Sequence, residues 1–193
     1  MVRPPPSPAF VQYIEDELLR APLLFEQVAE GTVDALRRHM ARLGAADRSA
    51  TSDLIQGLTT HRGRVAQIYT QTLREQAAQD QARQAAPAPT PAPAKPGRPL
   101  ALALVEEEEV AVDVELSHTI EYIKTHAEHE LRELRTFVAA LVGDLDVSAD
   151  HNPFRPEAHA KALWASAQAL PASRSWRMHF MRHATPPLAN VLR

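Results

Sequence analysis

Residues 116–141, LSHTIEYIKTHAEHELRELRTFVAAL, decide the fold class of this 193-residue chain. Their apolar side chains recur at steps of three or four residues: Leu116, Ile120, Ile123, Ala127, Leu131, Leu134, Val138 and Leu141. Because a turn of α-helix takes three to four residues, these positions form one apolar seam. The spacing predicts a single long amphipathic helix that begins near Glu106 and stops at Gly143.

The start of this helix allows a second interpretation. Val110, Val112 and Val114 alternate with polar residues, which is the period of a strand. The four consecutive glutamates at 106–109 favour a helix, because carboxylates are stabilised by the positive end of the helix dipole.

A proline-rich stretch precedes this region and separates the chain into two halves. Residues 86–100 contain six prolines, most of them alternating with alanine. Proline fixes φ and removes a backbone donor, so the stretch is predicted to be an extended, flexible Ala/Pro-rich linker. We therefore expect an N-terminal helical segment at 7–85 and a C-terminal helical segment at 101–193.

The N-terminal segment is predicted to contain three helices. The first has Ser7 as N-cap and Pro8 at its first position, and Pro22 is expected to end it. The second is expected to run to about residue 43, with Gly44 as its C-terminal glycine. The third is expected to begin near Thr51 or Ser52 and to fade into the Gln/Ala-rich run at 76–86.

The C-terminal segment continues beyond the long helix with two shorter ones. An irregular loop is expected at 144–155, followed by a helix that Pro156 opens and Pro171 closes. A last helix is expected from about Ser173 and should break at the Pro186-Pro187 pair. The predicted fold class is all-α, of helical hairpin or bundle type, with no convincing strand pair.

Composition excludes several classes of protein. The chain is 45% hydrophobic and contains no cysteine, and no apolar run approaches the roughly 20 residues of a membrane-spanning helix. The absence of cysteine removes disulfides and thiolate metal sites, so a cytoplasmic location is expected. The net charge of −3 gives no reason to expect nucleic acid or a membrane as a partner.

Charge is distributed unevenly within the second half. Residues 101–157 carry 14 acidic and 4 basic side chains, whereas residues 158–193 carry 5 basic side chains and no acidic one. One interpretation is that the basic C-terminal helices pack against the acidic long helix. The other is a partner-binding surface, for which the candidate residues are Arg174, Trp176, Arg177, Phe180 and Arg182, with His179 and His183 beside them.

Catalytic and metal-binding motifs are weak. His126 and His129 share a helical face, but they stand in a His-Glu-x-x-Glu pattern instead of the zinc-binding His-Glu-x-x-His. The chain also lacks a nucleophile elbow and the glycine-rich phosphate loops. We therefore predict no catalytic, cofactor-binding or metal-binding residues and no cofactor.

Three segments resemble the proteobacterial domain-of-unknown-function family 1631. They are the Leu-Val-acidic opening at 102–109, the end of the long helix at 141–143, and the Asn-Pro-Phe-Arg-Pro-Glu step at 152–157. The resemblance implies an all-helical fold and a bacterial protein. It also implies the N-terminal part of a protein that is usually much longer, and it supplies no catalytic motif.

The predicted function is a non-catalytic protein-interaction or regulatory module that acts on a protein partner. Its contact surface would combine the long helix at 106–142 with the basic, aromatic helix at 174–183. One alternative is a small hydrolase, metal-assisted or not, whose site contains His118, His126, His129 and His159. Another is a helical homo-oligomer that pairs through the seam at 116–141, or a truncated remnant of a longer family member.

Overall fold

The computed structural model describes residues 7–85, 107–143 and 150–193. These residues form seven α-helices and no strand: α1 (Pro8–Met40), α2 (Ala45–Thr60), α3 (Arg62–Ala85), α4 (Glu107–His126), α5 (Glu128–Val142), α6 (Pro156–Gln168) and α7 (Arg174–Leu192). The all-α prediction is confirmed. The predicted linker at 86–100 lies outside the described residues.

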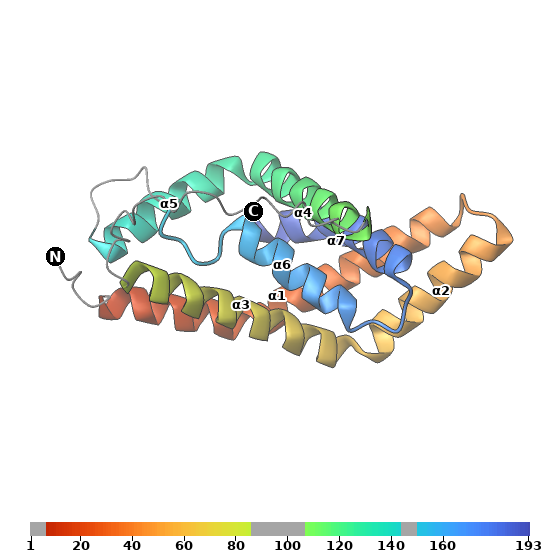
Figure 1. The fold of residues 1–193 in the computed structure, drawn as a ribbon, viewed down its shortest axis with the longest axis horizontal. Coiled ribbons are helices and arrows are strands. Elements are labelled where there is room, and N and C mark those ends of the chain that lie inside the picture. Colours follow the sequence, from red (N-terminus) through yellow and green to blue (C-terminus); the bar gives the residue numbers. More distant parts are fainter. Residues whose placement is uncertain (1–6, 86–106, 144–149) are drawn as a thin grey trace, which may run out of the picture.

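The helices lie in three layers, as Figure 1 shows. In one layer α1 and α3 run side by side, and in the next α6 packs on α3 while α7 packs on α1. The third layer is α4, which contacts both α6 and α7 and continues into α5. Helices from the two halves of the sequence therefore share one core.

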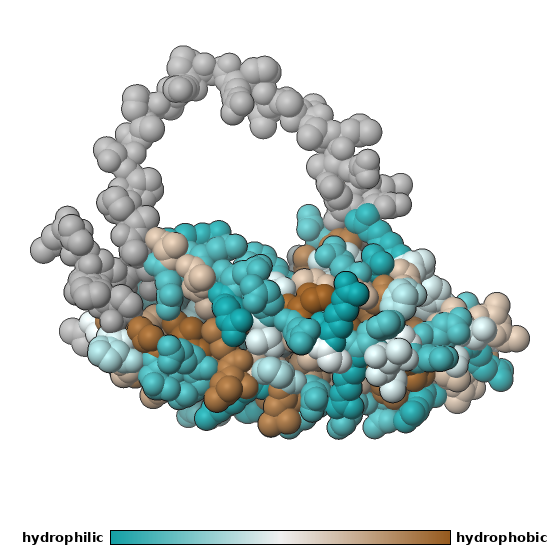
Figure 2. Space-filling view, turned by 90° about the horizontal axis from the view of Figure 1, so that it is seen from below, coloured by the Kyte–Doolittle hydropathy of each residue, from teal (hydrophilic) through white to brown (hydrophobic). Residues whose placement is uncertain are grey.

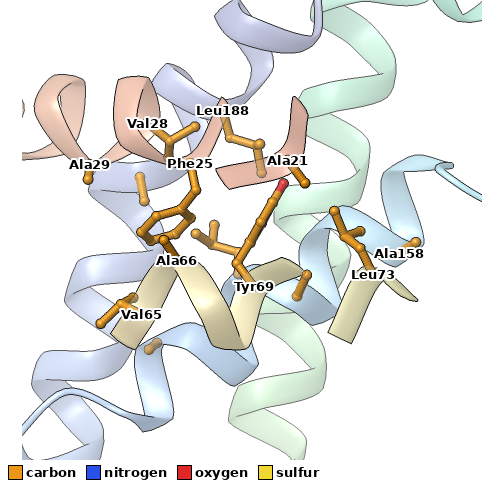
Figure 3. Packing of buried hydrophobic residues seen from close by; sticks show 14 of the residues in the cluster. Ala21, Phe25, Val28, Ala29, Val65, Ala66, Tyr69, Leu73, Ala158 and Leu188 are labelled. Atoms are coloured by element: carbon orange, nitrogen blue, oxygen red, sulfur yellow. The ribbon is translucent and has the colours of Figure 1, made fainter. Parts of the chain in front are cut away.

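The centre of that core lies between α1, α3, α6 and α7 (Figure 3). Phe25 of α1 faces Tyr69 of α3, with ring centroids 5.1 Å apart, and neither side chain is exposed. Leu188 of α7 lies close to this pair, and Ala158 of α6 lies beside Leu73 of α3. The long apolar stripes of α1 and α3 are buried here, so most of the helix stability comes from packing.

Local capping signals in the sequence are confirmed. The side chain of Ser7 accepts a hydrogen bond from the backbone N–H of Phe10, and Pro8 occupies the first turn. Gly143 ends α5 with φ of 72°, in the left-handed region that glycine adopts readily. Pro156 opens α6, and Ser173 lies at the N-cap position of α7.

Two of the predicted proline breaks, at Pro22 and at Pro186-Pro187, are wrong. Pro22 lies inside α1, so the first two predicted helices are one helix of 33 residues. Pro22 is exposed while its neighbours Ala21 and Phe25 are buried, so water can satisfy the backbone carbonyl that loses its donor. Pro186 and Pro187 likewise lie inside α7, between the buried Thr185 and Leu188, and packing on both sides outweighs the lost hydrogen bonds.

The third predicted helix is also wrong in its bounds. It begins at Ala45, with Gly44 as the N-cap of α2 instead of the C-terminal glycine of the preceding helix. It is then interrupted at His61, where φ is −101° and ψ is 13°, so α2 and α3 are separate helices.

The long helix predicted at 106–142 is interrupted at Ala127, with φ of −117° and ψ of 28°, and so forms α4 and α5. Beside the interruption, Nδ1 of His126 donates to the Tyr122 carbonyl at 2.9 Å and its ring stacks on Tyr122. A side chain that bonds the backbone in this way competes with the helix ladder.

The surface has no continuous apolar face in the view of Figure 2. Hydrophobic atoms appear there at separate places among hydrophilic side chains. None of the helices in the described part of the chain is long and apolar enough to cross a membrane.

Candidate functional site

The five residues predicted to bind a partner lie on the first three turns of α7. Phe180 is fully buried in the core, so the prediction that it lies on a contact surface is wrong. Arg182 is exposed, but its Nε donates to Oε2 of Glu115 at 2.8 Å. Arg174, Trp176 and Arg177 are half-buried, and Trp176 packs against the core.

The ion pairs between α7 and the acidic helices show that part of the charge asymmetry is satisfied within the chain. Glu115 of α4 is almost fully buried and pairs with Arg182. Arg193 Nε lies 3.5 Å from Oε1 of Glu130 on α5. The basic end of the sequence therefore does pack against its acidic middle.

The remaining two arginines border a groove of about 390 Å³ between α4, α6 and α7. Its lining residues are Val112, Asp113, Trp164, Gln168, Arg174 and Arg177. Arg177 donates from one terminal nitrogen to the Leu170 carbonyl at 3.3 Å. Its Nε is buried and has no hydrogen-bond partner among the described residues.

Among the residues that the structure describes, this groove is lined by two guanidinium groups, an indole and one carboxylate, that of Asp113. Guanidinium groups bind carboxylates in a fork-like geometry, and an indole offers a flat apolar surface. Val110 and Val114 on α4 are about half exposed, at 48% and 47%. The groove therefore offers the chemistry needed to bind a short acidic segment that also carries an apolar side chain.

The four histidines of the predicted hydrolase site do not converge. His118 is exposed on α4, while His126 is held against Tyr122. His129 is exposed and lies 3.4 Å from Oε1 of Glu133. His159 is buried in the core, so none of these rings meets another in a ligand set among the described residues.

His159 belongs to a closed polar pair. Its Nδ1 lies 2.7 Å from the hydroxyl of Tyr69, and both side chains are buried. Burial lowers the pKa of His159 to about 4, although a hydrogen bond with the backbone of Phe154 opposes that shift. Burial also raises the pKa of Tyr69 well above its ordinary value. Both groups are thus neutral at pH 7 and satisfy each other inside the core.

A different histidine cluster, which sequence reasoning did not predict, joins α1 to α7. It consists of His39 in the last turn of α1 and of His179 and His183, one turn apart on α7. One ring nitrogen from each lies within 4.8 Å of the other two, and the ring centroids are 4.5–5.3 Å apart. In the described part of the chain this is the one group of three side chains arranged to hold a metal ion.

The pKa values of the two α7 histidines of this cluster are lowered. Burial, followed by the neighbouring histidines and Arg182, lowers the pKa of His183 to about 4. Burial and the ring of His39 also lower the pKa of His179, against a smaller opposing effect of Asp47. The two α7 imidazoles are therefore neutral at pH 7, which is the form that binds metals.

One signal for this cluster was present in the sequence. His179 and His183 are four residues apart, the spacing at which two side chains of a helix lie side by side. The third member, His39, lies 140 residues earlier, and only the packing of α1 on α7 brings it to them. No local pattern could have identified it.

Comparison with known proteins identifies the family to which the chain belongs. The model of the protein of unknown function (DUF1631) N-terminal domain matches residues 12–187. No curated protein and no solved structure matches the chain. The match spans both halves of the sequence and confirms the resemblance found at 102–109 and 152–157. The chain therefore belongs to the DUF1631 family and corresponds to its N-terminal domain.

Proposed function

We propose that this domain is a non-catalytic protein-interaction module that acts in the cytoplasm. It binds an acidic segment of a partner protein in the groove between α4, α6 and α7. The single observation that carries the proposal is the juxtaposition of Arg174 and Arg177 with Trp164 along one groove of about 390 Å³.

The electrostatics of the groove favour an acidic partner over a basic or neutral one. Among the described lining residues, the guanidinium groups of Arg174 and Arg177 outnumber the one carboxylate, that of Asp113. Arg177 has further terminal N–H groups besides the one that donates to the Leu170 carbonyl, and such donors form charge-assisted hydrogen bonds with carboxylates. An apolar or aromatic side chain of the partner would pack against Trp164, as anchor residues do at other interfaces.

Burial of the seam at 116–141 within the chain argues against self-association through this seam. Ile123, Ala127 and Val138 of the seam are fully buried within the chain. Leu116, Leu134 and Leu141 pack against the same core. Little of the seam is left to pair with a second copy.

Selection from a phage-displayed library of random short peptides tests the proposal directly. We expect the selected peptides to combine Asp or Glu residues with an aromatic or large aliphatic one. Their affinity, measured by fluorescence anisotropy, should fall as salt is raised, because the contact is partly between exposed charges.

A matched pair of variants assigns the binding to the groove. Arg174→Gln with Arg177→Gln should weaken the selected peptide by at least about tenfold, since charge-assisted hydrogen bonds contribute roughly 1.5–3 kcal/mol each. Arg20→Gln with Arg74→Gln makes the same charge change at exposed sites outside the groove and should leave affinity unchanged. Equal binding by both double variants, or selection of peptides without acidic residues, would overturn the proposal.

Arg182 is unsuitable for this test. It pairs with the buried Glu115, so its replacement by Glu would place two carboxylates together and destabilise the fold. A loss of binding in that variant would not distinguish recognition from unfolding.

A further inference from the structure

The three-histidine cluster is separate from the groove and is not used by the proposed function. His39, His179 and His183 do not line the groove, and each is half-buried. A neutral imidazole has one ring nitrogen that donates and one with a lone pair, which needs a donor or a metal ion when it is buried.

Hydrogen bonding within the described residues leaves the cluster incomplete. The Nε2 of His179 is buried and has no hydrogen-bond partner there. The neighbouring Trp176 presents its ring edge-on, with centroids 5.0 Å apart, and supplies no bond to that nitrogen. The buried His159, by contrast, has the Tyr69 hydroxyl as a partner.

We propose that His39, His179 and His183 form a binding site for one divalent transition-metal ion of the zinc class. Neutral imidazole is a preferred ligand of such ions, and three of them leave one coordination position open. The site does not need thiolates, which the chain lacks. It joins the C-terminal end of α1 to the middle of α7.

The distances suit an ion after a small closure of the rings. Zinc–nitrogen bonds of about 2.0–2.1 Å in a tetrahedral site put the ligand nitrogens roughly 3.3 Å apart. The nitrogens of the three rings lie within 4.8 Å of one another, so each must move by about 1 Å. Rotation about the side-chain bonds of half-buried residues supplies such a movement without displacing a helix.

A close approach of the two helices sets the position of the rings. A Cβ added to Gly31 would lie 2.9 Å from Cβ of Pro187, so α1 and α7 are nearly in backbone contact there. Gly31 is two turns before His39, and Pro187 is one turn after His183. The glycine therefore brings the two helices together at the turns that lead to the histidines.

Charges around the cluster do not prevent cation binding. Arg182 is the nearest cation on α7, and its guanidinium is paired with Glu115. Asp47, at the start of α2, acts on His179 with the opposite sign and favours positive charge.

Metal titration of the full chain, purified without a histidine tag, tests the proposal. Zn²⁺ binding by isothermal titration calorimetry should give one site per chain, and Co²⁺ should give the visible absorption of a four-coordinate ion. His39→Gln and His183→Gln should each weaken Zn²⁺ by more than about 100-fold, because even changes beyond the ligands cost 10–100-fold. His126→Gln with His129→Gln removes two exposed histidines of α4 and α5 and should leave affinity unchanged.

A measurement on the unaltered chain covers the case in which the variants fail to fold. In ¹⁵N-detected NMR of the imidazoles, one equivalent of Zn²⁺ should shift the ring nitrogens of His39, His179 and His183 and leave those of His118 and His159 in place. Absence of a stoichiometric site, equal affinity in His183→Gln, or shifts at His126 and His129 instead would overturn the proposal.

Discussion

Two histidine environments in this domain use the same side chain in opposite ways. His159 lies wholly inside the core, and its Nδ1 is 2.7 Å from the Tyr69 hydroxyl. His39, His179 and His183 lie at the half-exposed junction of α1 and α7, with one buried nitrogen that has no partner in the described part of the chain. Burial lowers the pKa in both places.

The difference shows that a lowered pKa does not by itself mark a site. In the His159–Tyr69 pair each polar atom satisfies the other, so nothing remains to bind a ligand. In the three-histidine cluster the rings converge from two helices, and the buried Nε2 of His179 has no hydrogen-bond partner among the described residues. Convergence and incomplete hydrogen bonding, more than burial, distinguish a binding site from a structural contact.

Removing the buried ring should have the largest effect on stability. His159→Ala leaves a cavity and an unsatisfied Tyr69 hydroxyl, and we expect it to lower the free energy of unfolding by about 3–5 kcal/mol. His183→Ala removes a half-exposed ring and should cost less than about 1.5 kcal/mol in the absence of metal. Urea denaturation of both variants measures the difference, and equal losses would contradict the distinction between the two environments.

Acid should destabilise the fold through the same buried ring, that of His159. The pKa of His159 is about 4 in the folded chain and near 6.5 in the unfolded one, so the unfolded state binds more protons between these values. The share of the free energy of unfolding that depends on neutral His159 is therefore fully present above about pH 6.5. It is lost as pH falls toward 4, and it amounts to on the order of 3 kcal/mol. Urea midpoints measured over this range with EDTA present test the slope.

The variant without the ring provides the control for this slope. His159→Ala should show a flatter pH dependence between pH 6.5 and 4, although it is less stable throughout. Some slope should remain, because the pKa of His183 is also lowered to about 4, but solvent screens a half-exposed ring and makes its share smaller. A slope as steep as that of the unaltered chain would assign the acid sensitivity to other groups.

The sequence predicts the helices better than their ends. Helical spacing identifies the all-α class, and capping signals at Ser7, Pro156 and Gly143 are confirmed because they depend on nearby residues alone. Pro22 and the Pro186-Pro187 pair mislead, because tertiary packing on each side outweighs the local cost of proline. The break at Ala127, which follows the contact of His126 with Tyr122, is not revealed by apolar spacing.

The candidate sites are less predictable for the same reason. Arg174, Trp176 and Arg177 could be selected because they follow one another along a basic helix, but burial of Phe180 depends on what that helix packs against. The pairing of Arg182 with Glu115 and the arrival of His39 beside His183 both require helices that are far apart in sequence. Such contacts follow from the fold and not from any local pattern.

Metal should act on the cluster and leave the buried pair unaffected. If the three histidines bind Zn²⁺, then free Zn²⁺ at 100 times its dissociation constant should raise the free energy of unfolding by about 2.7 kcal/mol. Addition of EDTA should remove this gain. The gain should survive in Tyr69→Phe, although that variant starts from a lower stability, and should vanish in His39→Gln.

The close approach of α1 and α7 should produce the smallest of these effects and the most specific one. In Gly31→Ala the new methyl group would lie 2.9 Å from Cβ of Pro187, in a rigid ring that cannot turn aside. Overpacking of this kind costs roughly 1–3 kcal/mol, and the better helix propensity of alanine returns up to about 1 kcal/mol. We expect a net loss of about 1–2 kcal/mol together with weaker Zn²⁺ binding, because α7 must move away from His39.

Gly57→Ala is the matched control for this variant, because it also adds a methyl group to a glycine within a helix. There the new Cβ would lie 3.5 Å from the ring of Pro171, which is ordinary contact, so alanine should stabilise α2 by about 0.5–1 kcal/mol and leave Zn²⁺ affinity unchanged. Opposite signs in thermal denaturation would show that the α1–α7 junction at Gly31 is more tightly packed than the surroundings of Gly57. A stabilised Gly31→Ala with unaltered metal binding would mean that helix spacing at Pro187 does not position the cluster.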